Sequence, residues 1–373
     1  MTSQPLSIAI LGAGLMGRMM AVALTQLNQP SCQVTLFDQD DEQGQSSAAY
    51  LAAAMLAPLA ESVDATRKVM EMGERSLSLW PKFLQTLATP VFFQQQGTVV
   101  LSFEQDQPFL LDFQRRLKRQ DFMSVKAIKS EKIAQLEPGL VEQTKQFRYG
   151  LYLPSEGQLD NRELLKSLAI TIKQRDITWF TKAKVQTNGN QVSFNNQKQT
   201  FDWVIDCRGL GAQDSMPSSH QLRGVRGEVA RVYAPDVNLT RPVRLMHPRY
   251  PIYIAPKKNH HFVIGATQIE SEDQRQPTVR SSLELLSSCF SLHKGFAEAE
   301  ILEIKSGLRP ALNDNEPKIL VKDQHIKING LFRHGYLLAP AMVEQCVAVI
   351  QSKQPGLSSH KPPVFENLVE SIQ

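Results

Sequence analysis

The most constraining feature of the sequence is a glycine-rich turn near its beginning. Residues 7–11 (SIAIL) form an apolar run typical of a short buried strand, GAGLMG follows at 12–17, and residues 16–27 have apolar side chains at helical spacing. A second predicted strand at 33–38 ends on Asp38, 21 residues after the last glycine of the turn. This order predicts a βαβ unit in which the glycines admit a pyrophosphate at the helix N-terminus and the acid binds a ribose. The alternative is a glycine turn in another α/β fold.

Two later segments bear on which dinucleotide is bound. Residues 48–57 are almost entirely small or apolar, which favours either a plain helix or a strip that a flavin ring can approach closely. A second glycine turn follows a predicted strand in VIDCRGLGA (204–212), as expected where the chain passes the same cofactor. The sequence has no second, separate NAD(P) fingerprint. We therefore predict FAD that is reoxidised without a nicotinamide cofactor, with molecular oxygen as the simplest acceptor.

Composition places the chain among ordinary globular proteins and argues against a polyanionic partner. The 373 residues are enough for two interleaved domains, and 42% are hydrophobic and 21% charged. The formal net charge is only +4, and the basic side chains are scattered. Their densest cluster, at 115–120, is better explained as a solvated helix face than as a nucleic-acid patch. We expect no nucleic-acid partner.

Cysteine usage and hydropathy predict a location in the cytoplasm. The four cysteines form no CxxC pair and have no metal-ligand spacing, so reduced thiols and no metal site are expected. The first apolar run begins at Leu6 without a basic region before it, unlike a signal peptide. No uninterrupted apolar run approaches the ~18 residues that a membrane helix needs. We expect no membrane partner.

Two sets of predicted strands interleave along the chain. One set has the continuous apolar character of buried parallel strands, and the other alternates like antiparallel strands. We predict an α/β fold (α+β overall) in which a Rossmann-like FAD-binding domain is interrupted twice by an antiparallel-sheet substrate domain. The expected FAD-binding domain comprises residues 1–88, 151–222 and 307–373. The expected substrate domain comprises residues 89–150 and 223–306.

Local signals define several further elements. Asp160 is the expected N-cap of a helix over 161–175, and GLFRHGYLLAP opens a final helix that runs through Ile350. Residues 91–103 are expected to form a strand pair around Gly97. An Asn-Gly step predicts a hairpin within 184–194.

Eight segments carry a resemblance to a known family, in the same order and over nearly the whole chain. They are GAGLMG, AAAMLAPLAE, GQLDNRELL, VIDCRGLGA, YIAP, VIGAT, GLRP and GLFRHGYLLAP. Together they resemble the D-amino acid oxidase superfamily and, more narrowly, the FAD-dependent glycine oxidases of thiamine biosynthesis. The resemblance implies an FAD domain like that of para-hydroxybenzoate hydroxylase, FAD bound without a covalent link, and oxidative deamination of glycine, related small amines or D-amino acids.

The resemblance also implies roles for individual residues. Arg309, the only cation in SGLRPALNDNEP (306–317), would bind the substrate carboxylate, whereas a structural salt bridge or a pyrophosphate contact is the alternative. Tyr253 would support the same carboxylate, and Arg333 would lie near the substrate. The implied cofactor contacts are Gly12, Gly14, Leu15, Met16 and Gly17 in the turn, Asp38 and Gln39 at the ribose, Ala48, Ala49, Ala53, Ala54 and Met55 along the flavin, Val185 beside the adenine, and Leu331, Phe332, Arg333, His334, Gly335, Tyr336 and Leu337 over the flavin.

The sequence departs from the family pattern around the flavin. The family usually has glycine where this chain has Ala54, and it often reads GHFRNG where this chain has Leu331 and His334. These differences affect the expected substrate range more than the cofactor. His247 is expected to be a packed turn residue rather than a site group, and Cys207 a buried strand residue rather than a nucleophile.

The implied chemistry needs mainly binding and orientation. Hydride passes from the substrate Cα to flavin N5, the imine hydrolyses to glyoxylate or another keto acid and ammonia, and oxygen is reduced to hydrogen peroxide. The implied product would serve thiamine thiazole synthesis. A D-amino acid oxidase or dehydrogenase with a wider pocket, and a flavoprotein that matures the cofactor of a protein partner, are the alternatives. The expected partners are a small amine or amino acid and oxygen, and a homo-oligomer is left open.

Overall fold

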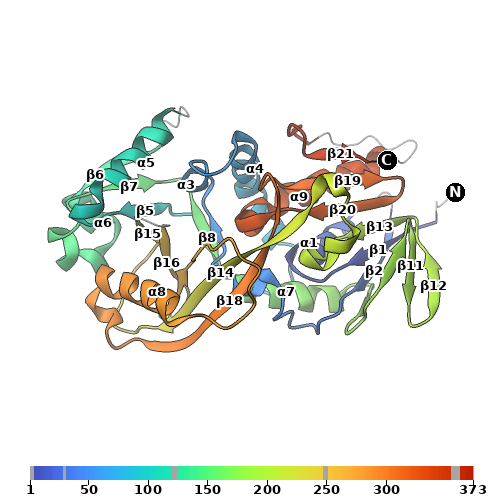
Figure 1. The fold of residues 1–373 in the computed structure, drawn as a ribbon, viewed down its shortest axis with the longest axis horizontal. Coiled ribbons are helices and arrows are strands. Elements are labelled where there is room, and N and C mark those ends of the chain that lie inside the picture. Colours follow the sequence, from blue (N-terminus) through green and yellow to red (C-terminus); the bar gives the residue numbers. More distant parts are fainter. Residues whose placement is uncertain (1–3, 28–30, 120–123, 247–250, 354–361, 373) are drawn as a thin grey trace.

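The computed structural model describes residues 4–27, 31–119, 124–246, 251–353 and 362–372. Its chain forms two lobes that lie side by side, each built around one large sheet (Figure 1). Both ends of the chain lie in the same lobe, which contains β1, β2 and β13 (Figure 1).

The first lobe contains a mainly parallel sheet that begins with the predicted βαβ unit. β1 lies between β2 and β13 and pairs in parallel with both, whereas β19 and β20 are antiparallel. Residues 8–11 of β1 are fully buried, as expected for a central parallel strand. Among the described residues the strand order is β21 (Val369–Ser371), β19 (Lys318–Lys322), β20 (His325–Asn329), β13 (Trp203–Asp206), β1 (Leu6–Leu11), β2 (Cys32–Phe37) and β9 (Ile177–Phe180).

The second lobe contains a largely antiparallel sheet, in which the two longest strands pair over almost their whole length. They are antiparallel from Leu222 opposite Leu312 to Tyr233 opposite Glu300, and they extend into the space between the lobes (Figure 1). Within the part of the chain that the structure describes, the order is β18 (Glu300–Leu312), β14 (Leu222–Tyr233), β17 (His261–Gly265), β16 (Ile252–Pro256), β15 (Val243–Leu245), β5 (Thr98–Leu101), β7 (Tyr149–Leu153) and β6 (Lys126–Lys129).

Two smaller sheets and a set of helices complete the fold. The small sheets are β10 (Gln186–Asn188), β11 (Gln191–Phe194) and β12 (Gln197–Thr200), and β3 (Met55–Leu56), β8 (Gly157–Leu159) and β4 (Phe93–Gln94). The α-helices are α1 (Leu15–Leu24), α2 (Ala48–Leu51), α3 (Pro58–Glu61), α4 (Arg67–Leu84), α5 (Gln107–Arg119), α6 (Ser130–Leu136), α7 (Asn161–Gln174), α8 (Val279–Leu292) and α9 (Gly335–Ser352).

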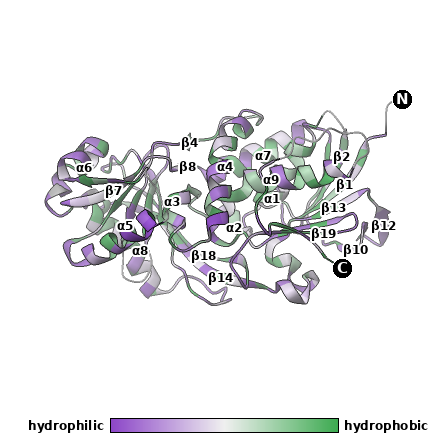
Figure 2. Ribbon diagram, turned by 90° about the horizontal axis from the view of Figure 1, so that it is seen from above, coloured by the Kyte–Doolittle hydropathy of each residue, from purple (hydrophilic) through white to green (hydrophobic). Residues whose placement is uncertain are grey.

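The core of the first lobe is formed by helices packed on the parallel sheet. Met19 and Met20 of α1 and Met342 of α9 belong to the same buried cluster as Ile8 and Ile10 of β1. In Figure 2, α1 and α9 are accordingly mostly hydrophobic, whereas β12 at the edge of the lobe is hydrophilic. α1 follows β1 and α9 follows β20, and both strands run parallel to β13, so the two helices begin at the same edge of the sheet.

Several local predictions are confirmed. Asp160 caps α7, because its side chain accepts hydrogen bonds from the backbone N–H groups of Arg162 and Glu163. The final helix α9 and the hairpin of β10 and β11 also form. The expected domain boundaries remain a prediction. β7 crosses the expected boundary at 150, and β18 crosses the one at 306.

The strand pair expected around Gly97 is wrong. Two strands are present, but β4 pairs with β8 while β5 pairs with β7 and β15. Gly97 has a φ of +80°, and a Cβ there would lie 2.4 Å from the Tyr152 ring. The glycine thus directs the chain from one sheet to another instead of closing a hairpin.

One departure from the family pattern has a direct backbone consequence. Ala54 has a φ of +54° and is 3% exposed. This left-handed conformation costs an L-residue with a Cβ roughly 1–2 kcal/mol, whereas glycine adopts it readily. The position therefore favours glycine, and this chain tolerates alanine there because the surrounding segments hold the backbone in place.

We expect Ala54→Gly to raise the melting temperature by about 1–2 °C, because relief of the left-handed strain exceeds the extra chain entropy of glycine. Ala52→Gly is the matched control, since Ala52 has an ordinary φ of −59°. The control should lower the melting temperature. Thermal unfolding at saturating FAD measures both, and a lower melting temperature for Ala54→Gly would contradict the assigned strain.

Candidate active site

The turn between β1 and α1 contains three glycines. The backbone conformation or close packing requires glycine at positions 12 and 17, whereas position 14 has room for a side chain. Gly12 has a φ of +90°, and a Cβ on Gly17 would lie 1.8 Å from the Gly12 carbonyl oxygen. A Cβ on Gly14, the N-cap of α1, would meet only Ser47, at 3.9 Å. No side chain caps this helix. The uncapped end of α1 therefore faces open space, where the helix dipole favours an anion such as a pyrophosphate.

Two charged side chains fix the shape of this turn. The Asp38 carboxylate accepts hydrogen bonds from the backbone N–H groups of Ala13, within the turn, and of Asp40, the latter at 2.6 Å. Arg18, which is 1% exposed, donates from Nε to the Ala13 carbonyl at 2.6 Å. Asp38 thus lies beside the turn at the end of β2, where an acidic residue can reach a ribose.

The small-residue strip at 48–55 is anchored by side chains from three other parts of the chain. Tyr336 Oη, in α9, donates to the Ala49 carbonyl at 2.9 Å, and Asn161 Nδ2, in α7, donates to the same oxygen at 2.9 Å. Lys257 Nζ, just after β16, donates to the Ala53 carbonyl at 3.0 Å. The strip therefore has a fixed position beside α7 and α9.

The N-terminus of α9 is a second uncapped helix end beside this strip. A Cβ on Gly335 would meet nothing within 4 Å, and no side chain caps the helix. A long dinucleotide fits these features, with its diphosphate at α1 and a ring that gains negative charge on reduction near α9. The residues present thus fit FAD along the strip.

The structure brings most of the predicted cofactor residues to this region with different exposures. Val185 packs in a buried cluster with Phe37, next to Asp38. The buried members are Gly12, Leu15, Met16, Gly17, Ala54, Val185, Leu331, Phe332, His334, Tyr336 and Leu337; the half-buried ones are Gly14, Asp38, Ala49, Ala53, Met55, Arg333 and Gly335; Gln39 and Ala48 are exposed. The cofactor contacts of the individual residues remain predictions.

Arg309 lies in β18 with its guanidinium on the backbone of β14. Nη2 donates to the Thr267 carbonyl at 3.0 Å and Nη1 to the Arg226 carbonyl at 3.3 Å, and both acceptors are neutral. Among the described residues, no carboxylate forms an ion pair with Arg309. A Cβ on Gly227 would lie 2.2 Å from Nη2, so the glycine provides the space that the guanidinium occupies.

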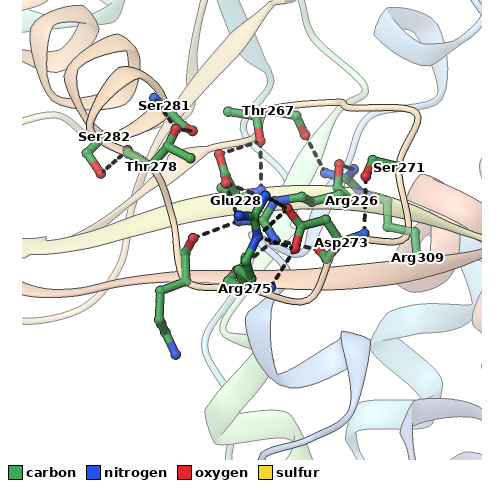
Figure 3. Close-up of polar contacts among 12 residues, drawn as sticks. Arg226, Glu228, Thr267, Ser271, Asp273, Arg275, Thr278, Ser281, Ser282 and Arg309 are labelled. Atoms are coloured by element: carbon green, nitrogen blue, oxygen red, sulfur yellow. Dashed lines mark hydrogen bonds and ion pairs between the residues drawn. The ribbon is translucent and has the colours of Figure 1, made fainter.

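A buried ion pair supports the backbone on which Arg309 lies (Figure 3). Arg226 and Glu228, 3% and 0% exposed, are joined by hydrogen bonds of 3.0 and 2.7 Å to Glu228 Oε1. Arg226 Nη1 also donates to the carbonyls of Asp273 and Arg275, and the Glu228 N–H donates to Thr267 Oγ1 at 2.9 Å. The ion pair therefore connects β14 to the segment around 267–275, which supplies one of the two acceptors of Arg309.

Tyr253, in β16, presents a polar atom without a partner. The side chain is 5% exposed, and its hydroxyl has no hydrogen-bond partner among the described residues. Burial raises the pKa of the phenol, so it stays protonated and can donate. A buried hydroxyl without a partner is uncommon in native proteins and is consistent with a ligand-binding role.

Arg333, unlike Arg309, has a carboxylate among its partners. Its Nε lies 2.8 Å from Glu61 Oε2, and its Nη1 donates to Gln268 Oε1 at 2.8 Å. Burial opposes the charge of Arg333, but Glu61 outweighs it and raises the pKa of the guanidinium. Burial likewise acts to raise the pKa of Glu61, but Arg333 holds it below the ordinary value. Both groups are therefore charged at neutral pH.

His334 lies on the other side of the same carboxylate. Its Nδ1 is 3.4 Å from Glu61 Oε2, and the residue is 4% exposed. Burial lowers the pKa of the imidazole to about 4. His334 is therefore neutral at neutral pH and adds no charge to the site.

Sequence reasoning missed the residues that hold the predicted ones in position. They are Arg18 at the glycine turn, Lys257 at the strip, and Glu61, Arg226, Glu228, Thr267 and Gln268 around the two arginines. Some left a signal in the sequence. Arg18 is the only charged residue within the apolar helix after the turn, and Glu61 is the only acid in residues 46–61. The long-range pairing of Glu61 with Arg333, 272 residues away, left none.

Comparison with known proteins identifies the family. A model of the FAD dependent oxidoreductase family, DAO, matches residues 7–347, and the chain belongs to this family. ThiO of Rhizobium etli, named as a thiamine biosynthesis oxidoreductase, is 34% identical over 347 residues, which cover 93% of this chain and 97% of that protein. The protein is thus an FAD-dependent oxidoreductase, and the predicted enzyme class and cofactor are confirmed.

Two solved structures share the fold. Glycine oxidase from Bacillus cereus ATCC 14579 has a TM-score of 0.79 and 20% identity, covering 94% of this chain and 98% of that one. Iminodiacetate oxidase from Chelativorans sp. BNC1 has a TM-score of 0.79 and 19% identity, covering 98% and 99%. The predicted fold class is confirmed.

The described residues contain neither a membrane-spanning helix nor a cluster of metal ligands. No helix in them combines the length and apolar character needed to cross a membrane. They also contain no group of three or more His, Cys, Asp or Glu side chains placed to hold a metal ion. His247 lies outside the described residues. His260 and His261 follow β16 and are exposed, and Cys207 is 8% exposed.

We expect Asp38→Ala to weaken FAD binding by roughly 10- to 150-fold, the equivalent of one charge-assisted hydrogen bond of ~1.5–3 kcal/mol. Asp40→Ala is the matched control, because the Asp40 side chain bonds to Ser46 and not to the turn. Titration of each apoprotein with FAD, followed by flavin fluorescence, gives the dissociation constants. Equal losses in the two variants would show that Asp38 has no special role.

We expect Gly227→Ala to displace the Arg309 guanidinium without unfolding the protein. The new Cβ would overlap only the end of a flexible side chain, and the backbone φ at this position is ordinary. FAD content should be unchanged, while KM for a carboxylate-bearing substrate should rise by ~10-fold or more. Gly224→Ala, on the same strand, is the control, because its Cβ would meet only side chains, the nearest being Leu308 at 3.0 Å. An unchanged KM in Gly227→Ala would show that the position of Arg309 does not limit binding.

Proposed function

We propose that this enzyme oxidises glycine and related small amines or D-amino acids that carry a single carboxylate. The observation that carries the proposal is the environment of Arg309, whose guanidinium, within the described part of the chain, bonds only to the neutral Arg226 and Thr267 carbonyls. Arg309 is half-buried, and a partly desolvated cation without a counter-ion is costly, so a ligand carboxylate is its expected partner. A planar guanidinium can hold that carboxylate at two points.

Tyr253 supports the proposed binding of a substrate carboxylate. Its protonated hydroxyl can donate a second contact to the carboxylate, from a strand of the same sheet as Arg309. Two anchors on one sheet restrict the rotation of a small substrate, so its Cα–H can be presented to one face of the cofactor. FAD, when bound, supplies the acceptor for the hydride. The amine becomes an imine, which water converts to glyoxylate or another keto acid and ammonia, while oxygen is reduced to hydrogen peroxide.

The relative from Rhizobium etli suggests a metabolic setting. Its name assigns that protein to thiamine biosynthesis, and the two chains match over nearly their full lengths. We extend this setting to the present chain, with glycine oxidation supplying a precursor for the thiazole ring. A cytoplasmic location would suit this role and stays a prediction, as does any homo-oligomeric state.

Arg309→Lys tests the proposal because it keeps the charge and removes the two-point grip. Loss of a charged hydrogen bond of ~1.5–3 kcal/mol should lower kcat/KM for glycine by roughly 10- to 150-fold, with FAD content unchanged. The measurement is stopped-flow reduction of the bound flavin by glycine, with an amine that lacks a carboxylate as the substrate control. Arg223→Lys, which alters an arginine bonded to Asn315 instead, is the matched variant.

The two variants separate a substrate contact from a general effect. In Arg223→Lys, glycine should reduce the bound flavin at the wild-type rate and with the wild-type dependence on glycine concentration. If the flavin of Arg309→Lys is also reduced at the wild-type rate and with the wild-type glycine dependence, Arg309 is a structural residue and the proposed substrate class loses its main support.

A further inference from the structure

Two arginines described at the candidate site, Arg309 and Arg333, differ in their availability to a ligand. Arg309 bonds to neutral carbonyls, whereas Arg333 is held by Glu61 at 2.8 Å and by Gln268 at 2.8 Å. The two guanidinium groups bond to adjacent residues, because Arg309 donates to the Thr267 carbonyl and Arg333 to the Gln268 side chain. After burial, the positive charge of Arg333 lowers the pKa of Arg309, while Glu61 acts in the opposite direction. The three groups therefore share one electrostatic environment.

The summed charge of Arg309, Arg333 and Glu61 is balanced by one substrate carboxylate. Arg309 and Arg333 contribute two positive charges and Glu61 one negative charge, while His334 is neutral because burial lowers its pKa to about 4. Arg244 and Glu156, which are also coupled to Glu61, bond to the Ala60 backbone at 2.8 and 2.7 Å, and burial raises the pKa of Glu156 to about 7. Of the residues that the structure describes, Arg309, Arg333 and Glu61 together thus carry a net charge of +1.

Arg333 could bind a second anion, but Glu61 already occupies its guanidinium. Its guanidinium is half-buried, with 20% of the side chain exposed, and Glu61 is nearly covered at 10%. Glu61 also meets His334, so it is fixed from two directions. A substrate with a second carboxylate would have to displace this fixed carboxylate or meet it as a like charge.

We propose that Glu61 determines specificity: by neutralising Arg333, it restricts the enzyme to substrates with one carboxylate. Gln268 assists as a positioning residue, because it holds the far side of the same guanidinium without adding charge. Substrates with a second carboxylate on the amine, such as iminodiacetate, or on the side chain, such as D-aspartate, are disfavoured. This inference rests on the proposed function, because it assumes that Arg309 binds the first carboxylate.

Glu61→Gln is the direct test. It removes the negative charge and frees Arg333 to bind a second carboxylate, so the ratio of kcat/KM for iminodiacetate to that for glycine should rise by ~10-fold or more. Gln268→Glu is the opposite change, since it adds a second carboxylate to Arg333, and it should lower that ratio. Glu137→Gln, which breaks the 2.7 Å buried pair with Arg241 in the second lobe, is the matched control and should leave the ratio unchanged.

A binding measurement separates this inference from the proposed function. Calorimetric titration of the FAD-loaded wild type with acetate and with malonate should give the tighter dissociation constant for acetate, and Glu61→Gln should reverse the order. Wild-type protein that neither oxidises glycine nor binds acetate would overturn the proposed function. Wild-type protein that does both, with an unchanged acetate-to-malonate ratio in Glu61→Gln, would overturn the role of Glu61 alone.

A folding defect in one variant does not remove the test. Loss of Glu61 leaves Arg333 without its counter-ion and can destabilise the protein. Gln268→Glu has the reverse effect on charge and keeps the ion pair, so its predicted fall in the iminodiacetate-to-glycine ratio can be measured independently. A rise in that ratio, or no change, would contradict the inference.

Discussion

The pairing of β14 with β18 is the constraint on which the site depends. These strands fix Gly227 opposite Gly307 and Val225 opposite Arg309. This register places the Arg309 guanidinium over the one β14 residue whose missing Cβ leaves room for it. A shift of one residue would turn Arg309 to the other face of the sheet. The long antiparallel pair thus determines where the expected carboxylate contact lies, far from the FAD turn in sequence.

Some charged side chains of the site are paired with a counter-ion, whereas other polar groups have no such partner. The Arg226–Glu228 pair and the Glu61–Arg333 pair are internally neutralised, and each holds other segments in position. Arg309 and the Tyr253 hydroxyl remain without a charged or hydrogen-bonding side-chain partner among the residues described. A fully paired site would be more stable but would offer nothing to a ligand, because binding energy comes from groups whose bonding capacity is unused.

Features defined by a few neighbouring residues could be predicted from the sequence. Features that depend on contacts between residues far apart in the sequence could not. The glycine turn, Asp38, the Asp160 cap and α9 follow from spacing and capping rules, which act over a few residues. The partners of Gly97 could not be predicted, because the flanking strands join different sheets through contacts far away in the sequence. Glu61 was missed for the same reason, since a buried carboxylate is explained only by the arginine that the fold brings to it.

The state of Arg309 connects stability to binding. Burial, aided by Arg333, lowers the pKa of its guanidinium to about 10, so the folded protein carries this charge at a cost. The cost is present in full below pH 10 and is relieved only as pH rises above that value, because the pKa is higher in the unfolded chain, which therefore stays protonated longer. Throughout the neutral range Arg309 is therefore charged and destabilising. A bound carboxylate supplies the missing counter-charge, so the free energy that the fold gives up at Arg309 is recovered when an anionic ligand binds.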